Sequence, residues 1–210
     1  MSEMKYGYAL PRVDPDRERQ EGEQIREAPF TYEAYAAMPD DGNRYEIVNG
    51  TLQLMSPGPS LPHQSVSSEL QHLLNQTCRS DYLIFDAPLD LILSSTDVRQ
   101  PDLMMVHRSR EEILTSRGIE GVPDLIVEIL SPGSMRRDRI SKGATYSQYG
   151  LEEYWIIDPL GEVLEQYLLR NGELRIVEVY EGDMPLKSNK VSSAQFTMNE
   201  LFAGVVKPKS

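Results

Sequence analysis

Short apolar runs of strand length follow one another through the middle of the chain, each bounded by turn residues or charges. They are Tyr82–Phe85, Leu89–Leu93, Leu103–Val106, Leu125–Leu130 and Glu153–Ile157. The run LIVEIL at 125–130 does not alternate apolar with polar residues, which is typical of a strand covered on both faces. The pattern therefore predicts a sheet with a buried strand at its centre.

Two further pairs of strands are separated by Asn-Gly, the dipeptide that most strongly favours a tight hairpin turn. The first pair is Arg44–Val48 and Thr51–Met55, around Asn49-Gly50; the second is Val163–Leu169 and Glu173–Tyr180, around Asn171-Gly172. We therefore expect two β-hairpins in addition to the central strands.

Helical spacing of apolar residues extends from His63 to Cys78. Capping threonines predict two shorter helices, one from Thr31 through about Met38 and one from Thr197 through Phe202. A fourth helix is expected from about Met135 to Gly150, since glycine suits the position after a helix end. Helices interleaved with strands predict an α/β domain with a mixed β-sheet core flanked by helices.

The 210 residues fit one domain. Residues 1–28 carry many charges and few aliphatic side chains, so we expect a disordered or loosely docked tail there, a domain over 29–204 and a short tail over 205–210. Cys78 is the single cysteine and cannot form an internal disulfide, which favours a reducing compartment. Without a signal-peptide pattern or an apolar run of ~18 residues, a cytoplasmic protein that does not cross a membrane is expected.

The charge balance limits the ways in which this chain could bind nucleic acid. Lys and Arg number 21 and Asp and Glu number 33, giving a net charge of −12. This argues against a protein that coats nucleic acid electrostatically, because phosphate contacts require concentrated cations. An enzyme that contacts DNA through one local patch stays compatible with the count.

Two acids lie in or beside predicted core strands. Glu128 is centred in LIVEIL, where a carboxylate must be paired, protonated or bound to a cation, unless the strand end lies in water. Asp102 leads directly into Leu103–Val106 and could equally be a strand-entry residue. Oxygen ligands from neighbouring strands are what a hard divalent cation requires, so the pair of acids favours a metal site.

A basic segment follows the strand that carries Glu128. Asp138 and Lys142 are four residues apart on the expected helix, where an exposed ion pair is the ordinary explanation. The same segment also carries Arg136, Arg137 and Arg139. A basic helix start beside metal-bound carboxylates could instead hold a phosphate.

Two other positions stay open. Glu46 alternates with Tyr45 and Ile47, so it is either a third ligand or a solvent-facing strand residue. His63 opens a helix after a proline-rich loop and could be a base, a ligand or a polar first-turn residue. If Glu46, Asp102 and Glu128 converge, their like charges raise at least one carboxylate pKa and cost folding free energy without a cation.

The sequence has no G-x-S-x-G, P-loop, G-x-G-x-x-G or HExxH motif. Three stretches carry a resemblance instead: RYEIVNGTLQLMSPGPSLPHQSVSSEL, VRQPDLMMV and PDLIVEILSPGSMRRDRISKGATYSQYGLEEYWIIDP. Together they closely resemble the Uma-two family, a branch of the restriction-endonuclease-like PD-(D/E)XK superfamily, over about Phe30 to Phe202.

The resemblance implies a restriction-endonuclease-like fold and a Mg²⁺-dependent (or Mn²⁺-dependent) DNA endonuclease. Asp102 and Glu128 match the metal ligands, and Glu46 matches an early acidic position that completes the metal shell. The superfamily motif has lysine two residues after the glutamate, where this chain has Leu130. Lys142 on the following helix is the matching amine, and Arg136, Arg137 and Arg139 would contact nucleic acid.

The second interpretation is a catalytically inactive module of the same fold that binds nucleic acid or a protein partner, because kinship of fold does not establish activity. Leu130 and the net charge of −12 favour this alternative, whereas Asp102, Glu128 and Lys142 favour the enzyme. A homodimer is compatible with either interpretation.

Overall fold

The computed structural model describes residues 28–55, 58–131 and 141–206, which form two six-stranded sheets. The central sheet has the strand order β12-β11-β10-β9-β6-β3. Its strands are β3 (Tyr82–Asp86), β6 (Leu103–His107), β9 (Leu125–Ile129), β10 (Glu153–Asp158), β11 (Val163–Arg170) and β12 (Glu173–Tyr180). Within this sheet β9 and β10 are parallel and the other neighbouring pairs are antiparallel. The sheet is therefore mixed, as the sequence predicts.

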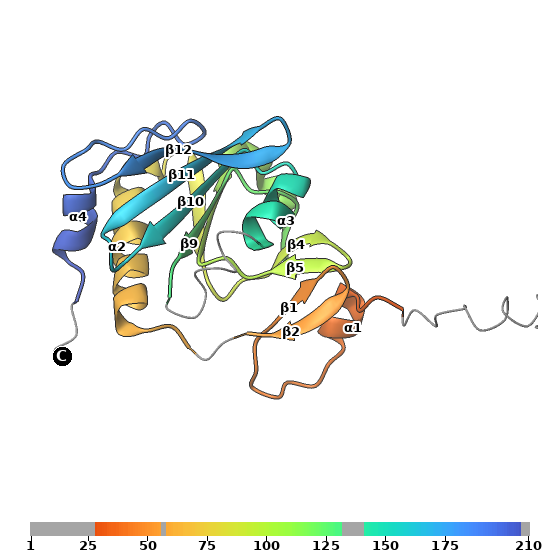
Figure 1. Cartoon of the computed structure of the whole chain (residues 1–210). Coiled ribbons are helices and arrows are strands. Elements are labelled where there is room, and N and C mark those ends of the chain that lie inside the picture. The colour runs from red at the N-terminus through yellow and green to blue at the C-terminus, as the bar shows by residue number, and fades with distance from the viewer. Residues whose placement is uncertain (1–27, 56–57, 132–140, 207–210) are drawn as a thin grey trace, which may run out of the picture.

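The second sheet has the order β2-β1-β5-β4-β8-β7 and lies on one side of the central sheet (Figure 1). It consists of β1 (Tyr45–Val48), β2 (Thr51–Leu54), β4 (Leu91–Ser94), β5 (Asp97–Arg99), β7 (Leu114–Thr115) and β8 (Gly118–Glu120). The short helix α1 (Tyr32–Ala36) packs on its β1 and β5 through a small apolar cluster of its own. This sheet carries Glu46 on β1.

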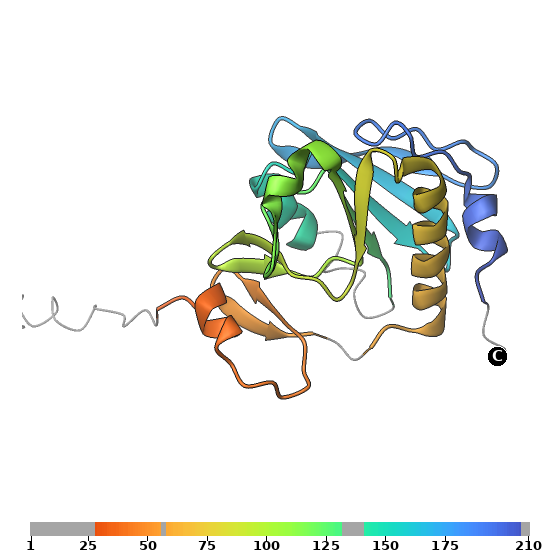
Figure 2. The ribbon, with the colours of Figure 1, turned by 180° about the vertical axis from the view of Figure 1, so that it is seen from behind.

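Helices cover the two faces of the central sheet differently. The long helix α2 (Leu61–Cys78) lies on one face with α4 (Met198–Ala203) outside it, and Figure 2 shows the same order from behind. Helix α3 (Gly143–Gln148) and the second sheet lie on the opposite face. A 3₁₀ helix, η1 (Arg108–Ile113), joins β6 to β7.

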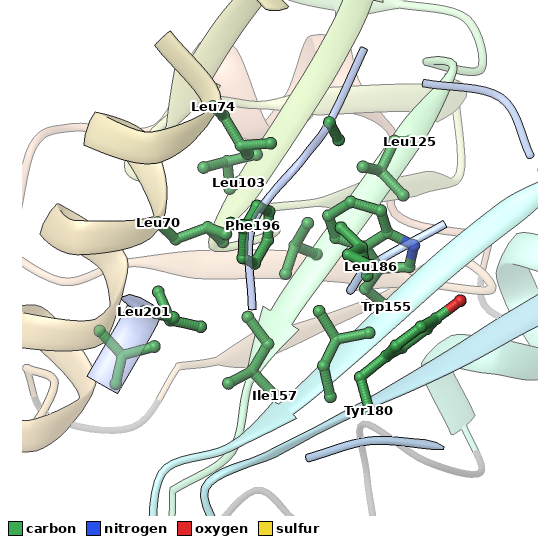
Figure 3. Packing of buried hydrophobic residues seen from close by; sticks show 14 of the residues in the cluster. Leu70, Leu74, Leu103, Leu125, Trp155, Ile157, Tyr180, Leu186, Phe196 and Leu201 are labelled. Atoms are coloured by element: carbon green, nitrogen blue, oxygen red, sulfur yellow. The ribbon is translucent and has the colours of Figure 1, made fainter. Parts of the chain in front are cut away.

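The side chains of β9 explain why LIVEIL has no polar alternation. Leu125, Val127 and Ile129 pack toward α2, in the cluster drawn in Figure 3. Ile126 and Leu130 pack toward α3 on the opposite face. Because both faces are covered, every residue of the strand is buried. Glu128 shares the parity of Ile126 and Leu130, so its side chain belongs to the α3 face.

Most predicted elements are confirmed. Asn49 and Gly50 have φ values of 49° and 73°, and Asn171 and Gly172 have 53° and 82°, as two-residue hairpin turns of this kind require. The turns join β1 to β2 and β11 to β12, with Val48 paired to Thr51 and Arg170 paired to Glu173. Cys78 is a buried free thiol at the end of α2.

Some elements differ from the expectation. The strands β5, β7 and β8 contain two or three residues each, too few for a hydrophobic period to reveal them. The fourth expected helix is described only from Ser141 onward, and α3 begins at Gly143. Its predicted start near Met135 lies outside the described residues, as do residues 1–27 of the expected tail over 1–28 and residues 207–210 of the expected tail over 205–210. Among the helices that are described, none is both long and apolar enough to cross a membrane.

Candidate active site

Glu128 is the centre of a buried polar cluster between β9 and α3. Its side chain is 3% exposed, and its Oε2 lies 2.7 Å from the Nζ of Lys142. Its Oε1 accepts a hydrogen bond of 2.9 Å from the hydroxyl of Tyr146. Lys142 directly precedes α3 and Tyr146 follows four residues later, so both side chains lie on one side of the helix start. The carboxylate is thus compensated by a cation and a hydroxyl donor.

Glu46 reaches the same lysine from the second sheet. Its Oε1 lies 3.8 Å from the Nζ of Lys142 and accepts a hydrogen bond of 3.1 Å from the backbone N–H of Gln100. Glu46 is 2% exposed, so the solvent-facing alternative for this residue is wrong. One ammonium group therefore lies between two glutamates that come from different sheets.

Asp102 lies on the neighbouring strand, directly before β6. Leu103 pairs with Val127 in the antiparallel β6–β9 ladder, so Asp102 and Glu128 occupy facing backbone positions one residue beyond that pair. The Oδ2 of Asp102 accepts a hydrogen bond of 2.7 Å from the backbone N–H of Ile129. The same oxygen lies 3.1 Å from the Nε2 of His63 on α2, and the Asp102 side chain keeps 20% of its surface exposed.

Arg99 on β5 extends the cluster, and sequence reasoning missed it. Its guanidinium donates 2.9 Å to the Thr145 hydroxyl and 3.3 Å to the Oδ1 of Asp97, and it lies 4.0 Å from Glu46. The side chain is 2% exposed. The only sequence signal is an arginine two residues after an aspartate, a spacing that fits an exposed strand pair equally well.

The surroundings of Tyr146 fix its protonation. Burial raises the pKa of its hydroxyl well above the ordinary value of 10, and the negative charge of Glu128 raises it further. The hydroxyl therefore stays protonated at neutral pH and acts as a hydrogen-bond donor to Glu128. A fixed donor on a candidate ligand holds that carboxylate in one orientation.

The carboxylates of Asp102, Glu128 and Glu46 decide whether the site can hold a metal ion. Asp102 and Glu128 offer oxygen atoms from adjacent strands, the ligand type that Mg²⁺ prefers. Across the described ranges, no group of three or more His, Cys, Asp or Glu side chains is arranged to hold a metal ion. Glu46 is directed to Lys142 and Arg99, so the expected third ligand stays a prediction. Arg136, Arg137 and Arg139 lie outside the described residues.

Comparisons with known proteins agree with this architecture. A solved structure described as a putative nuclease belonging to DUF820, from Anabaena variabilis ATCC 29413, superposes with a TM-score of 0.69. It shares 21% sequence identity, and the alignment covers 85% of this chain and 100% of that one, which confirms the fold. No curated protein matches the sequence significantly. The model of the Uma2 family, described as putative restriction endonuclease, matches residues 32–199. The chain therefore belongs to the Uma2 family, as its motifs predict.

Proposed function

We propose that this chain is a metal-dependent endonuclease that hydrolyses phosphodiester bonds in DNA. The observation that carries the proposal is the contact of 2.7 Å between Lys142 and Glu128. Glu128 lies on β9, and Asp102 occupies the facing backbone position directly before the neighbouring strand β6. Two acids and one amine in this relation are the parts that phosphodiester hydrolysis needs. Membership of a family described as putative restriction endonuclease supports the same reaction class.

Asp102 and Glu128 would hold the cation, Mg²⁺ or Mn²⁺, and the third ligand would come from Glu46. When bound, such an ion supplies positive charge that polarises the scissile phosphate and lowers the pKa of the attacking water. Tyr146 keeps Glu128 oriented by its hydrogen bond. The backbone N–H of Ile129 does the same for Asp102.

Lys142 would take the part of the lysine that the superfamily motif has two residues after the glutamate. Leu130 occupies that motif position and is buried in the apolar cluster under α3, where it contributes packing only. Lys142 brings an ammonium group to Glu128 from the following helix instead. It would neutralise charge that develops on the phosphate during attack.

The remaining parts of the proposal rest on the sequence. Arg136, Arg137 and Arg139 would contact the phosphates of DNA beside the carboxylates. A cytoplasmic location is proposed from the single cysteine and the reducing compartment that it favours. A homodimer is proposed as well, and light scattering on the full chain would measure its mass.

One observation favours the second candidate function, an inactive module that binds nucleic acid or a protein partner. Both oxygens of Glu128 already have donors, one from Lys142 and one from Tyr146. A carboxylate satisfied in this way can serve folding alone. Activity measurements are therefore needed to separate the two candidates.

The test is incubation of supercoiled plasmid with the full chain and Mg²⁺ or Mn²⁺. Wild type should nick or linearise the plasmid, and Lys142→Met should lower the rate by about 10²–10³-fold, as expected when one charge-stabilising donor is removed. Lys190→Met is the matched control, because Lys190 forms a partly exposed pair with Glu152. If wild type leaves the plasmid intact with both Mg²⁺ and Mn²⁺, the endonuclease is refuted and the inactive binding module is the function that stays. Cleavage at an undiminished rate by Lys142→Met would remove Lys142 from the mechanism.

A further inference from the structure

His63 is buried against Asp102, although it occupies the first turn of a helix. Helix α2 begins at Leu61, and its N-terminus is capped by the side chain of Ser60, which accepts from the backbone N–H of His63. The imidazole is therefore not needed as a cap. It is 8% exposed, and its Nε2 lies 3.1 Å from the Oδ2 of Asp102.

The other ring nitrogen of His63 indicates that the contact between His63 and Asp102 does more than fill space in the core. Its Nδ1 is buried and has no hydrogen-bond partner among the residues that the structure describes. A buried polar atom without a partner costs folding free energy, so an apolar side chain at this position would serve stability better. The contact between His63 and Asp102 therefore points to a role in the site rather than in the core.

The two oxygens of Asp102 are in different environments. Oδ2 accepts a hydrogen bond from Ile129 N–H and lies 3.1 Å from His63 Nε2, whereas Oδ1 has no hydrogen-bond donor within the described part of the chain. Ile129 approaches this oxygen from β9, and the imidazole of His63 approaches it from α2. Two polar groups held against one oxygen limit the rotation of the carboxylate about its last bond, and Oδ1 is then the oxygen left for a ligand.

We propose that His63 is a positioning residue that orients Asp102 for divalent-cation binding. The inference rests on the proposed function, since it takes Asp102 as a ligand. His63 carries its proton on Nε2 and donates it to Oδ2, so that Oδ1 is presented at a constant angle beside Glu128. Residues that hydrogen-bond a metal ligand in this way are typically worth about 10–100-fold in metal affinity or activity.

The experiment measures the dissociation constant of Mn²⁺ for the full chain by calorimetry, with thermal unfolding of the metal-free protein alongside. His63→Leu should weaken Mn²⁺ binding by about 10-fold or more, while the melting temperature stays the same or rises. His63→Gln keeps a nitrogen donor near the position of Nε2 and should recover part of the affinity. His72→Leu is the matched control, because His72 lies on the same helix but is exposed, and it should bind Mn²⁺ like wild type.

A second readout separates positioning from a direct part in the reaction. In plasmid cleavage, His63→Leu should raise the Mn²⁺ concentration needed for half-maximal rate and leave the rate at saturating Mn²⁺ nearly unchanged. If His63→Leu does not fold, the comparison of His63→Gln with His72→Gln decides the question in the same assays.

The outcomes distinguish this inference from the proposed function. Wild type that binds no Mn²⁺, or Asp102→Asn that binds it unchanged, overturns the metal site and the role of His63 together. Wild-type binding that is lost in Asp102→Asn but kept in His63→Leu and His63→Gln overturns the role of His63 alone. Weaker binding by His63→Leu with recovery by His63→Gln supports it.

Discussion

At the scale of single residues, the candidate site is built around the buried carboxylate of Glu128, which has donors from Lys142 and Tyr146. Glu128 could be singled out because a carboxylate among five aliphatic residues must be compensated. Its partner was harder to predict, since Lys142 lies fourteen residues away and also has Asp138 at helical spacing. Tyr146 could not be assigned a role from the sequence, because a tyrosine on a helix is usually a packing residue.

The contact with Lys142 reverses one expectation about stability. Three converging acids without a cation would repel one another, and Glu128→Gln would then be as stable as wild type or more so. With the ammonium of Lys142 at 2.7 Å, the same change leaves a buried cation with weaker compensation. We expect Glu128→Gln to lower the free energy of unfolding of the metal-free protein by about 3–5 kcal/mol, measured with urea.

Two variants complete that measurement. Glu152→Gln removes a surface acid that pairs with Lys190, and it should change the stability by less than about 0.5 kcal/mol. Glu128→Gln combined with Lys142→Met removes both charges and should recover much of the loss. Wild-type stability in Glu128→Gln alone would show that Lys142 does not depend on this carboxylate.

At the scale of elements, strands with long apolar runs and hairpins with Asn-Gly turns were predictable from local sequence. The second sheet was not, because β5, β7 and β8 are too short to show a period and are held by pairing with strands distant in the sequence. Arg99 lies on one of these short strands, and its hydrogen bond to Thr145 connects β5 to the start of α3. The segment that carries Lys142 is therefore held by the sheet that sequence patterns did not reveal.

This connection predicts a large effect of Arg99→Met on stability. The change leaves Asp97 and Glu46 buried without a nearby guanidinium, so the free energy of unfolding should fall by about 3 kcal/mol or more. Arg175→Met is the control, because Arg175 forms an exposed pair with Glu173 and should change stability by less than about 0.5 kcal/mol. Equal urea midpoints for the two variants would refute the bridging role of Arg99.

At the scale of the whole molecule, the candidate site lies where three units meet. Asp102 and Glu128 come from the central sheet, Glu46 and Arg99 from the second sheet, and Lys142 from the start of α3. Sequence patterns predicted the mixed α/β class, but they could not show that two sheets meet there, because strand pairing is decided by long-range contacts. The burial of charges from all three units makes the site sensitive to the stability of the entire fold.

The same sensitivity allows unfolding of the whole chain to report cation binding without knowledge of the DNA substrate. At about ten times its dissociation constant, an ion that binds only the folded protein stabilises it by ~1.4 kcal/mol. For a domain of this size that increment raises the melting temperature by about 3–6 °C. Asp102→Asn and Glu128→Gln should lose most of the rise, each compared with its own metal-free melting temperature.

The control for this measurement is Glu173→Gln, which removes an exposed acid on β12 that pairs with Arg175 and should keep the full Mg²⁺ response. NaCl at matched ionic strength accounts for screening of the net charge of −12, which alone could stabilise an acidic protein. A melting temperature that rises equally with Mg²⁺ in wild type, Asp102→Asn and Glu128→Gln would place the cation elsewhere. A rise confined to wild type and Glu173→Gln would assign the ion to Asp102 and Glu128. The reason is that removal of one charge at either of these two residues, but not at Glu173, would then abolish the stabilisation of the fold by the bound ion.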